Sequence, residues 1–276
     1  MKEIYLARVF HRESMPGNLT GVVVCPSPPR PRDCQFVARR LGLPDTCFVW
    51  KSASGNWMHR TFSPYEELTF CTQTLLAGAA CLQAGKDCPF ETAIGPVTVH
   101  RDEGQYWIRQ DVDKARRLKD RSVLHRLGLE EQLLGGEPAV TGVGRQRLYI
   151  PLRSPGILYR LTFSSEIILR ECRRHGWTGL CFFAVMDEGH VALRVFTTSL
   201  KGGEDAATGG AALGLIGYHR FQSLGLSERV RVEQGPAGSE KRGCIRLRWS
   251  SSSPSVWLGS PVDVLMRGTL VVRQGG

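Results

Sequence analysis

The amino-acid sequence predicts an α+β protein whose two halves are related by an internal repeat. In the first half, a strand ending in Arg60-Thr-Phe-Ser63 is followed by Glu67 and then by a helix rich in alanine and glycine. In the second half, Arg194-Val-Phe-Thr197, Glu204 and another such helix follow in the same order. Short matches also arise by coincidence in strand-rich proteins. Here the small helix interiors match as well, and a helix threaded through a curved sheet needs short side chains, so we interpret the halves as a duplication.

Length and charge restrict the class of protein. A chain of 276 residues can form one large domain or two of about 130 residues, and either can bury a core. The 36 basic and 26 acidic residues leave a formal charge of +10, which suits a nucleic acid or an acidic small substrate. The arginines are scattered, and the dense run from Lys114 to Arg126 is typical of a linker entering a surface helix. We therefore expect a small acidic substrate and no nucleic-acid partner.

The cysteines form no disulfide or metal-binding pattern. There are nine, with no CxxC pair, and the single Cys172-x-x-His175 motif has no second pair to complete a tetrahedral site. The first residues, MKEIYLARVF, are typical of a strand rather than of a signal sequence, and no apolar run approaches about 18 residues. These patterns predict a cytoplasmic protein with reduced thiols, no metal and no membrane partner.

The elements of the first half follow from apolar alternation and turn signals. Asp33 is a candidate N-cap for a helix that Gly42 would end, and a second helix should run from Thr72 to Gln83. The sequence Asp102-Glu103-Gly104-Gln105 signals a hairpin. Strands are expected at residues 3–10, 21–25, 47–50, 57–62, 96–101 and 106–110.

The charged stretch from Asp111 to Asp120 is the candidate boundary between domains spanning residues 1–113 and 114–276. Beyond it, helices are expected over 121–134, from Ser165 to Arg174 with Gly176 as the stop, and after Gly209. Strands are expected at residues 148–152, 180–186, 191–197, 230–233 and 244–249, with short strands to 273. The last strand, near 266–273, is a candidate to pack back on the first domain.

Two adjacent carboxylates, Glu204 and Asp205, stand just ahead of the second repeat helix. The N-terminus of a helix carries N–H groups without intrahelical partners and a partial positive charge, so it can hold an anion. If pseudo-symmetry relates the halves, we expect the two helix N-termini to face each other across a cleft that binds a carboxylate-bearing small molecule.

Motifs spread from the first strand to the last resemble those of the phenazine-biosynthesis PhzF-like proteins, which share the diaminopimelate epimerase fold. The E-D-x-A-T-G motif, at its distance after R-x-F-[ST]-P, is the most specific of them. The matching pieces are Gly17-Asn18, Leu43–Val49, Arg60–Pro64, Glu67-Leu68-x-Phe70 and Glu204–Gly210, with weaker echoes at Gln234-Gly235 and Arg242-Gly243.

The resemblance implies two pseudo-symmetric, β-barrel-like domains, each wrapped around a central helix, with the active site in the cleft between them. It also implies proton transfer without a cofactor, as in isomerases and epimerases that are often homodimers. In the family a glutamate, a Gly-His pair and an aspartate form the catalytic set. The corresponding residues here are Asp45, Thr72-Gln73 and Asp205, so only Asp205 is unchanged. Asp45 is one methylene shorter than glutamate, and Gln73 cannot shuttle protons, which indicates an altered reaction or substrate position.

Each candidate has an alternative, structural role. Asp45 suits an Asx turn after Pro44 as well as acid–base catalysis, and Asp205 suits N-terminal capping. Glu67 and Glu204, at equivalent repeat positions, suit a shared structural role better than direct chemistry. A thiol at a helix N-terminus has a lowered pKa and could act as a base, but Cys71 lacks the second thiol that two-cysteine racemases need, so a buried structural thiol is favoured. His219, well down its helix, is also expected to be structural.

The remaining polar residues near the two helix starts suit binding. Their backbone N–H groups could hold the substrate carboxylate and stabilise the charge that develops as a carbon-bound proton leaves. This set comprises Thr72, Gln73, Thr74, Thr208, Gly209 and Gly210, with Asn18 added by family position.

Together these features predict a cofactor-independent isomerase that moves a proton or double bond in a small unsaturated or amino-acid-like acid. Asp45 and Asp205 would transfer the proton. By analogy with the family, the setting is antibiotic or other specialised metabolism, including modified proline precursors of the lincomycin type. The alternatives are an epimerase that inverts one stereocentre and a binding protein that has lost the proton shuttle.

Overall fold

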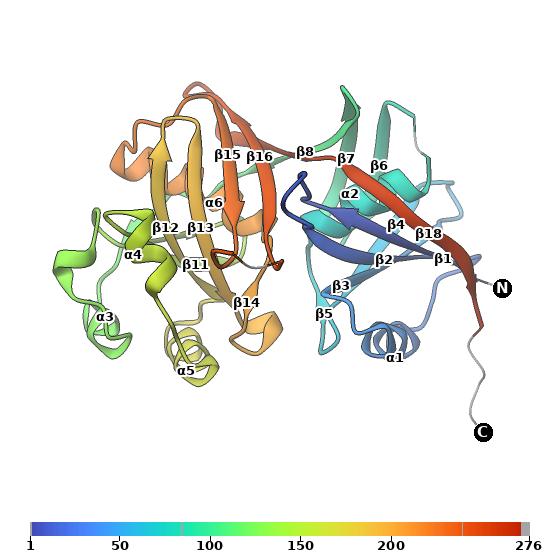
Figure 1. The fold of residues 1–276 in the computed structure, drawn as a ribbon. Coiled ribbons are helices and arrows are strands. Elements are labelled where there is room, and N and C mark those ends of the chain that lie inside the picture. The colour runs from blue at the N-terminus through green and yellow to red at the C-terminus, as the bar shows by residue number, and fades with distance from the viewer. Residues whose placement is uncertain (1, 84, 239, 272–276) are drawn as a thin grey trace. The chain divides into compact units, whose positions relative to one another are not determined.

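The computed structural model describes residues 2–83, 85–238 and 240–271, which form two compact units (Figure 1). Of the described residues, the first unit contains 2–11, 18–83, 85–108 and 259–271, and the second contains 12–17, 109–238 and 240–258. No helix in the described part of the chain is long and apolar enough to cross a membrane. The domain boundary near residue 113 stays a prediction. In the structure the chain passes from the first unit to the second after Ile108 and returns at Gly259.

The first unit is a mixed sheet that surrounds one helix. The helix, α2 (Thr72–Cys81), contacts strands on several sides of it, and all ten of its residues are buried. A second helix, α1 (Pro31–Leu41), covers β3 and β4 from outside. The strands are β1 (Lys2–Val9), β2 (Asn18–Val24), β3 (Asp45–Lys51), β4 (Trp57–Phe62), β5 (Glu67–Leu68), β6 (Asp87–Thr92), β7 (Gly95–Asp102), β8 (Gln105–Asp111), whose last residues enter the second unit, and β18 (Val262–Leu270).

The second unit has the same plan, with α6 (Gly209–Gln222) as its central helix and α4 (Pro155–Arg160) and α5 (Ser165–His175) outside β12 and β13. Short helices lie at α3 (Ser122–Arg126), Glu131–Leu133 and Thr198–Leu200. The strands are β9 (Arg116–Arg117), β10 (Ala139–Gly142), β11 (Gln146–Pro151), β12 (Gly179–Asp187), β13 (His190–Thr197), β14 (Glu204–Asp205), β15 (Arg229–Gln234), β16 (Gly243–Trp249) and β17 (Ser255–Ser260), which ends in the first unit.

Strand pairing repeats between the units. In the first, β2 pairs parallel with β3, β3 antiparallel with β4, and β4 parallel with β6. In the second, β11 pairs parallel with β12, β12 antiparallel with β13, and β13 parallel with β15. The central helix connects β5 to β6 in one unit and β14 to β15 in the other. The same order of elements and pairings supports the duplication inferred from the sequence.

The repeated R-x-F motif forms the same structure twice. Arg60 donates to both carboxylate oxygens of Glu67, at 2.6 and 2.7 Å, and Arg194 donates to both oxygens of Glu204, at 2.8 Å each. Each guanidinium also lies over the ring of the phenylalanine two residues on. These paired, planar contacts hold the short strand after the motif against the motif strand, which gives Glu67 and Glu204 a structural role.

Small residues let α6 pack closely against the wall of its own unit. A β-carbon added to Gly214 would lie 2.7 Å from Cζ of Tyr149 and closer still to its hydroxyl oxygen. That hydroxyl donates to the carbonyl of Ala211 at 2.8 Å, and Tyr149 is fully buried. Glycine at position 214 is therefore required by the tyrosine on β11.

Two helix boundaries differ from the sequence-based expectation. The first outer helix begins at Pro31 with Arg30 as its N-cap, so the expectation that Asp33 caps it is wrong. Asp33 lies in the first turn and accepts a hydrogen bond from Arg30 Nε at 2.8 Å. Proline suits the first helical position because its missing N–H would have no partner there. The C-cap, Gly42, is left-handed with φ of 64°, which confirms the expected stop.

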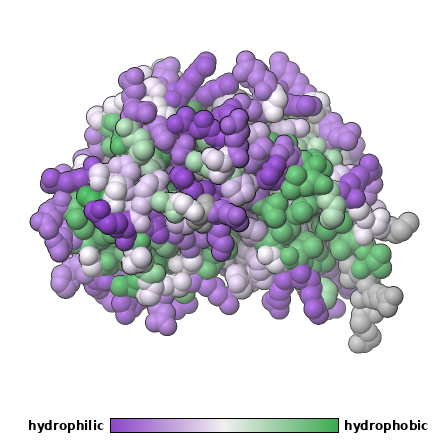
Figure 2. Space-filling view, in the orientation of Figure 1, coloured by the Kyte–Doolittle hydropathy of each residue, from purple (hydrophilic) through white to green (hydrophobic). Residues whose placement is uncertain are grey.

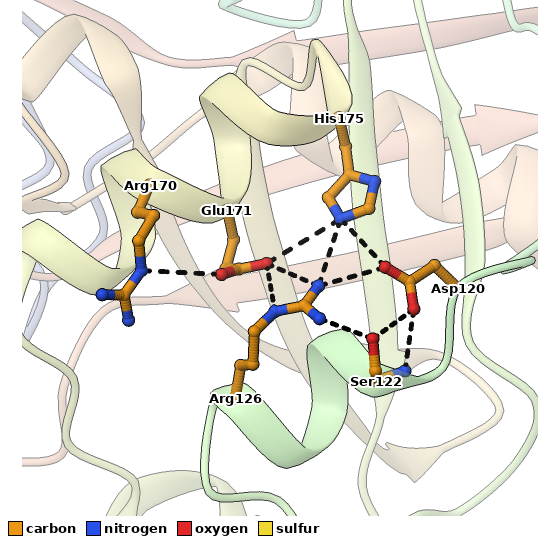
Figure 3. A network of polar contacts seen from close by, with 6 residues as sticks. All are labelled: Asp120, Ser122, Arg126, Arg170, Glu171 and His175. Carbon is orange, nitrogen blue, oxygen red and sulfur yellow. Dashed lines mark hydrogen bonds and ion pairs between the residues drawn. The ribbon is translucent and has the colours of Figure 1, made fainter.

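The single helix expected over residues 121–134 is wrong. Gly128 adopts a φ of 70°, and the helix ends at Arg126. An ion-pair network instead holds this short helix, α3, to α5 (Figure 3). Arg126 donates from Nε to the fully buried Glu171 at 2.9 Å and from Nη2 to Asp120 at 3.1 Å. Hydrogen bonds from Ser122 and Arg126 lower the pKa of Asp120 to about 2.

Candidate active site

Each central helix presents free backbone donors at its first turn. Helix α2 begins at Thr72 with Cys71 as its N-cap, and α6 begins at Gly209 with Thr208 as its N-cap. The first N–H groups of a helix have no intrahelical acceptor, which applies to residues 72–74 in α2 and to residues 209–210 in α6. In α6 the N–H groups of residues 211 and 212 already bond the carbonyl of Thr208. The two helix starts are thus local concentrations of donors and partial positive charge.

Asp45 lies beside the first turn of α2. It is the first residue of β3, and the Cys71 thiol donates to its Oδ2 at 3.3 Å. Burial, reinforced by the neighbouring Asp45 carboxylate, raises the pKa of the Cys71 thiol well above its ordinary value. A raised pKa fits the structural thiol that the sequence favoured over a base, and here the thiol serves as a hydrogen-bond donor.

The side chain of Gln73 is fully engaged inside the first unit. Its Oε1 accepts from Asn18 Nδ2 at 2.8 Å, and its Nε2 donates to Thr20 Oγ1 at 2.7 Å and to the Leu19 carbonyl at 3.4 Å. Asn18, Thr20 and Gln73 are all buried. Thr20 is paired in register with Asp45 across β2 and β3, so this network fixes the strand next to the Asp45 carboxylate. The geometry therefore suits a role for Gln73 in positioning the strand that carries Asp45.

Thr74 and Thr72 complete the first turn of α2. The Thr74 hydroxyl donates to the Cys71 carbonyl at 3.1 Å and lies 2.8 Å from the hydroxyl of Thr61. It is fully buried, and Thr72 is nearly so. Any ligand contact from these two residues would therefore come through the backbone N–H groups rather than through the hydroxyls.

Asp205 has a comparable environment beside α6. The Thr208 hydroxyl donates to its Oδ2 at 2.6 Å, and the N–H of Ala207 donates to its Oδ1 at 3.5 Å. The helix N-cap is Thr208, so the alternative in which Asp205 caps the helix does not describe the structure. The two hydrogen bonds hold the carboxylate in one orientation against the loop that connects β14 to α6.

Gln234, the last residue of β15, organises that loop. Its Nε2 donates to the Asp205 carbonyl at 2.7 Å and to Thr208 Oγ1 at 2.9 Å, while its Oε1 accepts from the Thr208 N–H at 2.9 Å. Gln234 is fully buried. Because the N–H and hydroxyl of Thr208 are both engaged, the donors left at this helix start belong to Gly209 and Gly210. The sequence offered only the weak Gln234-Gly235 echo as a signal for this residue.

The other candidates lie in structural settings. Glu67 and Glu204 form the bidentate arginine pairs described above. His219 accepts from the N–H of Leu224 at 3.1 Å and packs against Trp249, near the end of α6. Within the described residues, no cluster of three or more His, Cys, Asp or Glu side chains is placed to hold a metal ion.

Both units therefore place an aspartate at the start of a buried central helix, with its carboxylate bonded by the side chain of the N-cap residue. Two sheet-wrapped helices in an α+β chain define the diaminopimelate epimerase-like class of fold. A sequence model of the phenazine biosynthesis-like proteins (PhzC-PhzF) matches residues 7–271, and the chain belongs to this family.

Two curated relatives are named as uncharacterized isomerases. One, from Deinococcus radiodurans, is 27% identical over 94% of this chain and 86% of its own length. The other, from Bacillus subtilis, is 25% identical over 99% of this chain and 98% of its own. Together with the family membership, these names support isomerase activity for this chain.

Solved structures agree with the fold. A PhzC/PhzF protein from Clostridium difficile matches with a TM-score of 0.80 at 22% identity, covering 99% of this chain and all of its own. A hydroxyproline epimerase from Agrobacterium vitis, solved with bound trans-4-hydroxy-L-proline, matches with a TM-score of 0.62 at 9% identity, over 97% and 91% of the two chains. The fold is therefore shared with an enzyme that inverts a carbon centre.

Proposed function

We propose that this protein is a cofactor-independent isomerase that moves a proton or double bond in a small unsaturated or amino-acid-like carboxylic acid. The observation that carries the proposal is the repeated placement of an aspartate beside the N-cap of a central helix. Cys71 donates to Asp45 in one unit, and Thr208 donates to Asp205 in the other. Proton transfer requires carboxylates held in a fixed orientation next to donors that can stabilise developing negative charge.

In this proposal the carboxylates of Asp45 and Asp205 transfer the proton. One takes a proton from a carbon adjacent to a conjugated system, and the same or the other carboxylate returns it at a new carbon. Gln73 cannot replace the histidine of the family pattern as a proton carrier, because a carboxamide does not titrate. Its bonds to Asn18 and Thr20 support a positioning role instead.

In this proposal the first turns of α2 and α6 bind the substrate. The backbone N–H groups of Gly209, Gly210 and residues 72–74 would bond a substrate carboxylate or the enolate-like oxygen that forms as the proton leaves. Thr208 would act through Asp205, since its own polar groups are engaged by Gln234 and Asp205.

The proposed setting is specialised metabolism, including antibiotic biosynthesis, with modified proline precursors as one substrate class. A protein with this fold binds trans-4-hydroxy-L-proline, which makes proline derivatives a reasonable starting panel. Sharing a fold does not transfer a substrate, so the panel also includes unsaturated acids without a ring.

The test is turnover in heavy water followed by proton NMR, with the native protein, Asp45→Asn and Asp205→Asn. For the true substrate we expect each substitution to lower the rate by at least about a hundredfold, which is the usual contribution of a positioned acid or base. Asp33→Asn, on the outer helix α1, is the matched control and should leave the rate unchanged. Unchanged turnover in both site variants would refute the assignment.

The same experiment separates the alternatives. An isomerase places deuterium at a carbon other than the one that lost the proton, whereas an epimerase places it at the starting carbon with inversion. A binding protein would hold a carboxylic acid without exchanging any of its carbon-bound protons.

We further propose a cytoplasmic homodimer. All nine cysteines are free thiols, which suits a reducing compartment. Apolar side chains gather over the region of β1, β2 and β18 in Figure 2, where Val264, Leu265 and Met266 on β18 are 45%, 48% and 51% exposed. Three consecutive exposed apolar residues on a strand suit contact with a second copy. Sedimentation should give a dimer for the native chain and a monomer for Leu265→Lys; a monomeric native chain would refute this part.

A further inference from the structure

Arg147 is a buried guanidinium without a counter-ion. It lies in β11, is 6% exposed, and makes one long hydrogen bond, from Nη1 to the carbonyl of Arg145 at 3.4 Å. Its Nε has no hydrogen-bond partner, and Arg147 forms no ion pair with a carboxylate in the described part of the chain. A buried charge is costly unless it is paired, so this arrangement calls for an anion that the chain itself does not supply.

The position of Arg147 is set by the packing of α6 on β11. Tyr149, two residues along the strand, shares its face and donates to the carbonyl of Ala211. Arg147 lies opposite Gly210, the residue before Ala211, at the first turn of the helix. A β-carbon added to Gly210 would lie 3.4 Å from Nη1 of Arg147 and 3.7 Å from Nη2. The guanidinium therefore stands against the turn whose Gly209 and Gly210 N–H groups lack intrahelical acceptors.

We propose that Arg147 and the first turn of α6 together form the receptor for a carboxylate group of the substrate, with Arg147 as its charged binding residue. The inference rests on the proposed function, which it deepens by giving the substrate acid a specific anchor in the second unit. A guanidinium offers paired N–H donors in the plane that matches a carboxylate, and the helix start adds donors and partial positive charge.

Glycine at position 210 is part of this receptor. A β-carbon added there would already lie in ordinary contact with both terminal nitrogens, so a longer side chain would occupy the space next to the guanidinium. Gln234 and Asp205 complete the arrangement by engaging Thr208, which leaves the glycine N–H groups as the available donors.

The test uses sodium acetate as the probe and the amide signals of Gly209 and Gly210 in the nitrogen–proton NMR spectrum as the readout. In the native protein we expect saturable shifts of both signals. Arg147→Met should weaken acetate binding by at least about tenfold, the usual effect of losing a hydrogen bond to a charged group, and Arg147→Lys should lie between the two. Arg246→Met removes the same charge from an exposed site on β16 and should bind acetate as the native protein does.

Thermal unfolding of the native protein and of Arg147→Met distinguishes a binding arginine from a structural one. Without acetate, Arg147→Met should have an unfolding temperature equal to or above that of the native protein, because an uncompensated buried charge is removed. A structural arginine would give the opposite result, a less stable variant with unchanged acetate affinity, which would overturn the proposal, as would unresponsive glycine amides. Acetate binding without any effect of Asp45→Asn or Asp205→Asn on turnover would refute the catalytic assignment alone.

Discussion

The equivalent glycines Gly78 and Gly214 should respond in opposite ways to substitution by alanine. Both lie six residues after the threonine that begins their repeat segment, Thr72 or Thr208. A β-carbon on Gly78 would meet Phe90 Cζ at 3.4 Å, an ordinary contact. A β-carbon on Gly214 would lie 2.7 Å from Cζ of Tyr149, far inside contact distance. The same chemical change is therefore harmless in one half and disruptive in the other.

The magnitudes follow from helix propensity and packing. Alanine is favoured over glycine inside a helix by about 1 kcal/mol, so Gly78→Ala should be neutral or stabilising by up to that amount. Gly214→Ala gains the same propensity but displaces a fully buried tyrosine. Overpacking costs about 1–3 kcal/mol, and loss of the 2.8 Å bond from Tyr149 to Ala211 adds about 1–3 kcal/mol. The net expectation is a loss of about 1–5 kcal/mol in the free energy of unfolding.

Urea unfolding followed by circular dichroism measures both variants, and Tyr149→Phe provides the internal control. Removing the hydroxyl relieves the closest overlap but leaves Cζ in place, so Tyr149→Phe should partly rescue Gly214→Ala in a double-mutant cycle. Equal stability of Gly78→Ala and Gly214→Ala would refute the close-packing argument for α6.

Three further predictions concern charge and titration. Burial lowers the pKa of His59 to about 4, so between pH 6.5 and 4 the unfolded chain binds the proton more readily than the folded chain. As the pH falls from 6.5 to 4, the free energy of unfolding should therefore fall by up to about 3 kcal/mol. His59→Gln should flatten this part of the stability–pH profile, and an unchanged profile would contradict the assignment. In urea unfolding, Glu204→Gln should lower the free energy of unfolding by about 2–3 kcal/mol and Glu67→Gln by less than about 1 kcal/mol. The reason is burial: the side chains of Arg194 and Glu204 are 8% and 18% exposed, whereas those of Arg60 and Glu67 are 29% and 39% exposed. Equal losses would show that burial does not decide the outcome. Cys71, with its raised pKa, should react with iodoacetamide at pH 8 more slowly than free cysteine, and faster reaction, followed by peptide mass spectrometry, would mean that the thiol is ionised.

The repeat and the central helices could be predicted because their signals are local. Arg60 and Glu67, and Arg194 and Glu204, are close in sequence, and a helix rich in alanine and glycine indicates by its composition that it is packed closely on all sides. The helix expected over residues 121–134 was predicted wrongly, although Gly128 stands within it. The left-handed turn at that glycine overrides the pattern.

The candidate site could be predicted only where a motif carries it. Asp45 and Asp205 stand in recognisable motifs, whereas Gln234 acts on Thr208 from 26 positions away, and only the fold brings them together. The pKa of the Cys71 thiol is raised rather than lowered, because burial and Asp45 outweigh the helix N-terminus. Arg147 has no motif; its importance rests on the absence of a counter-ion among the described residues, which no sequence pattern reveals.

The last strand has a consequence for the order in which the chain can fold during synthesis. Strand β18 pairs antiparallel with β1 along nearly its whole length, from Lys2 opposite Leu270 to Val9 opposite Val262. The first unit therefore lacks one of its strands until residues near 270 have left the ribosome, whereas the second unit has all of its residues by Leu258. The unit that is synthesised first is completed last. Until then β1 can pair with β2 on one edge, while its other edge stays unpaired.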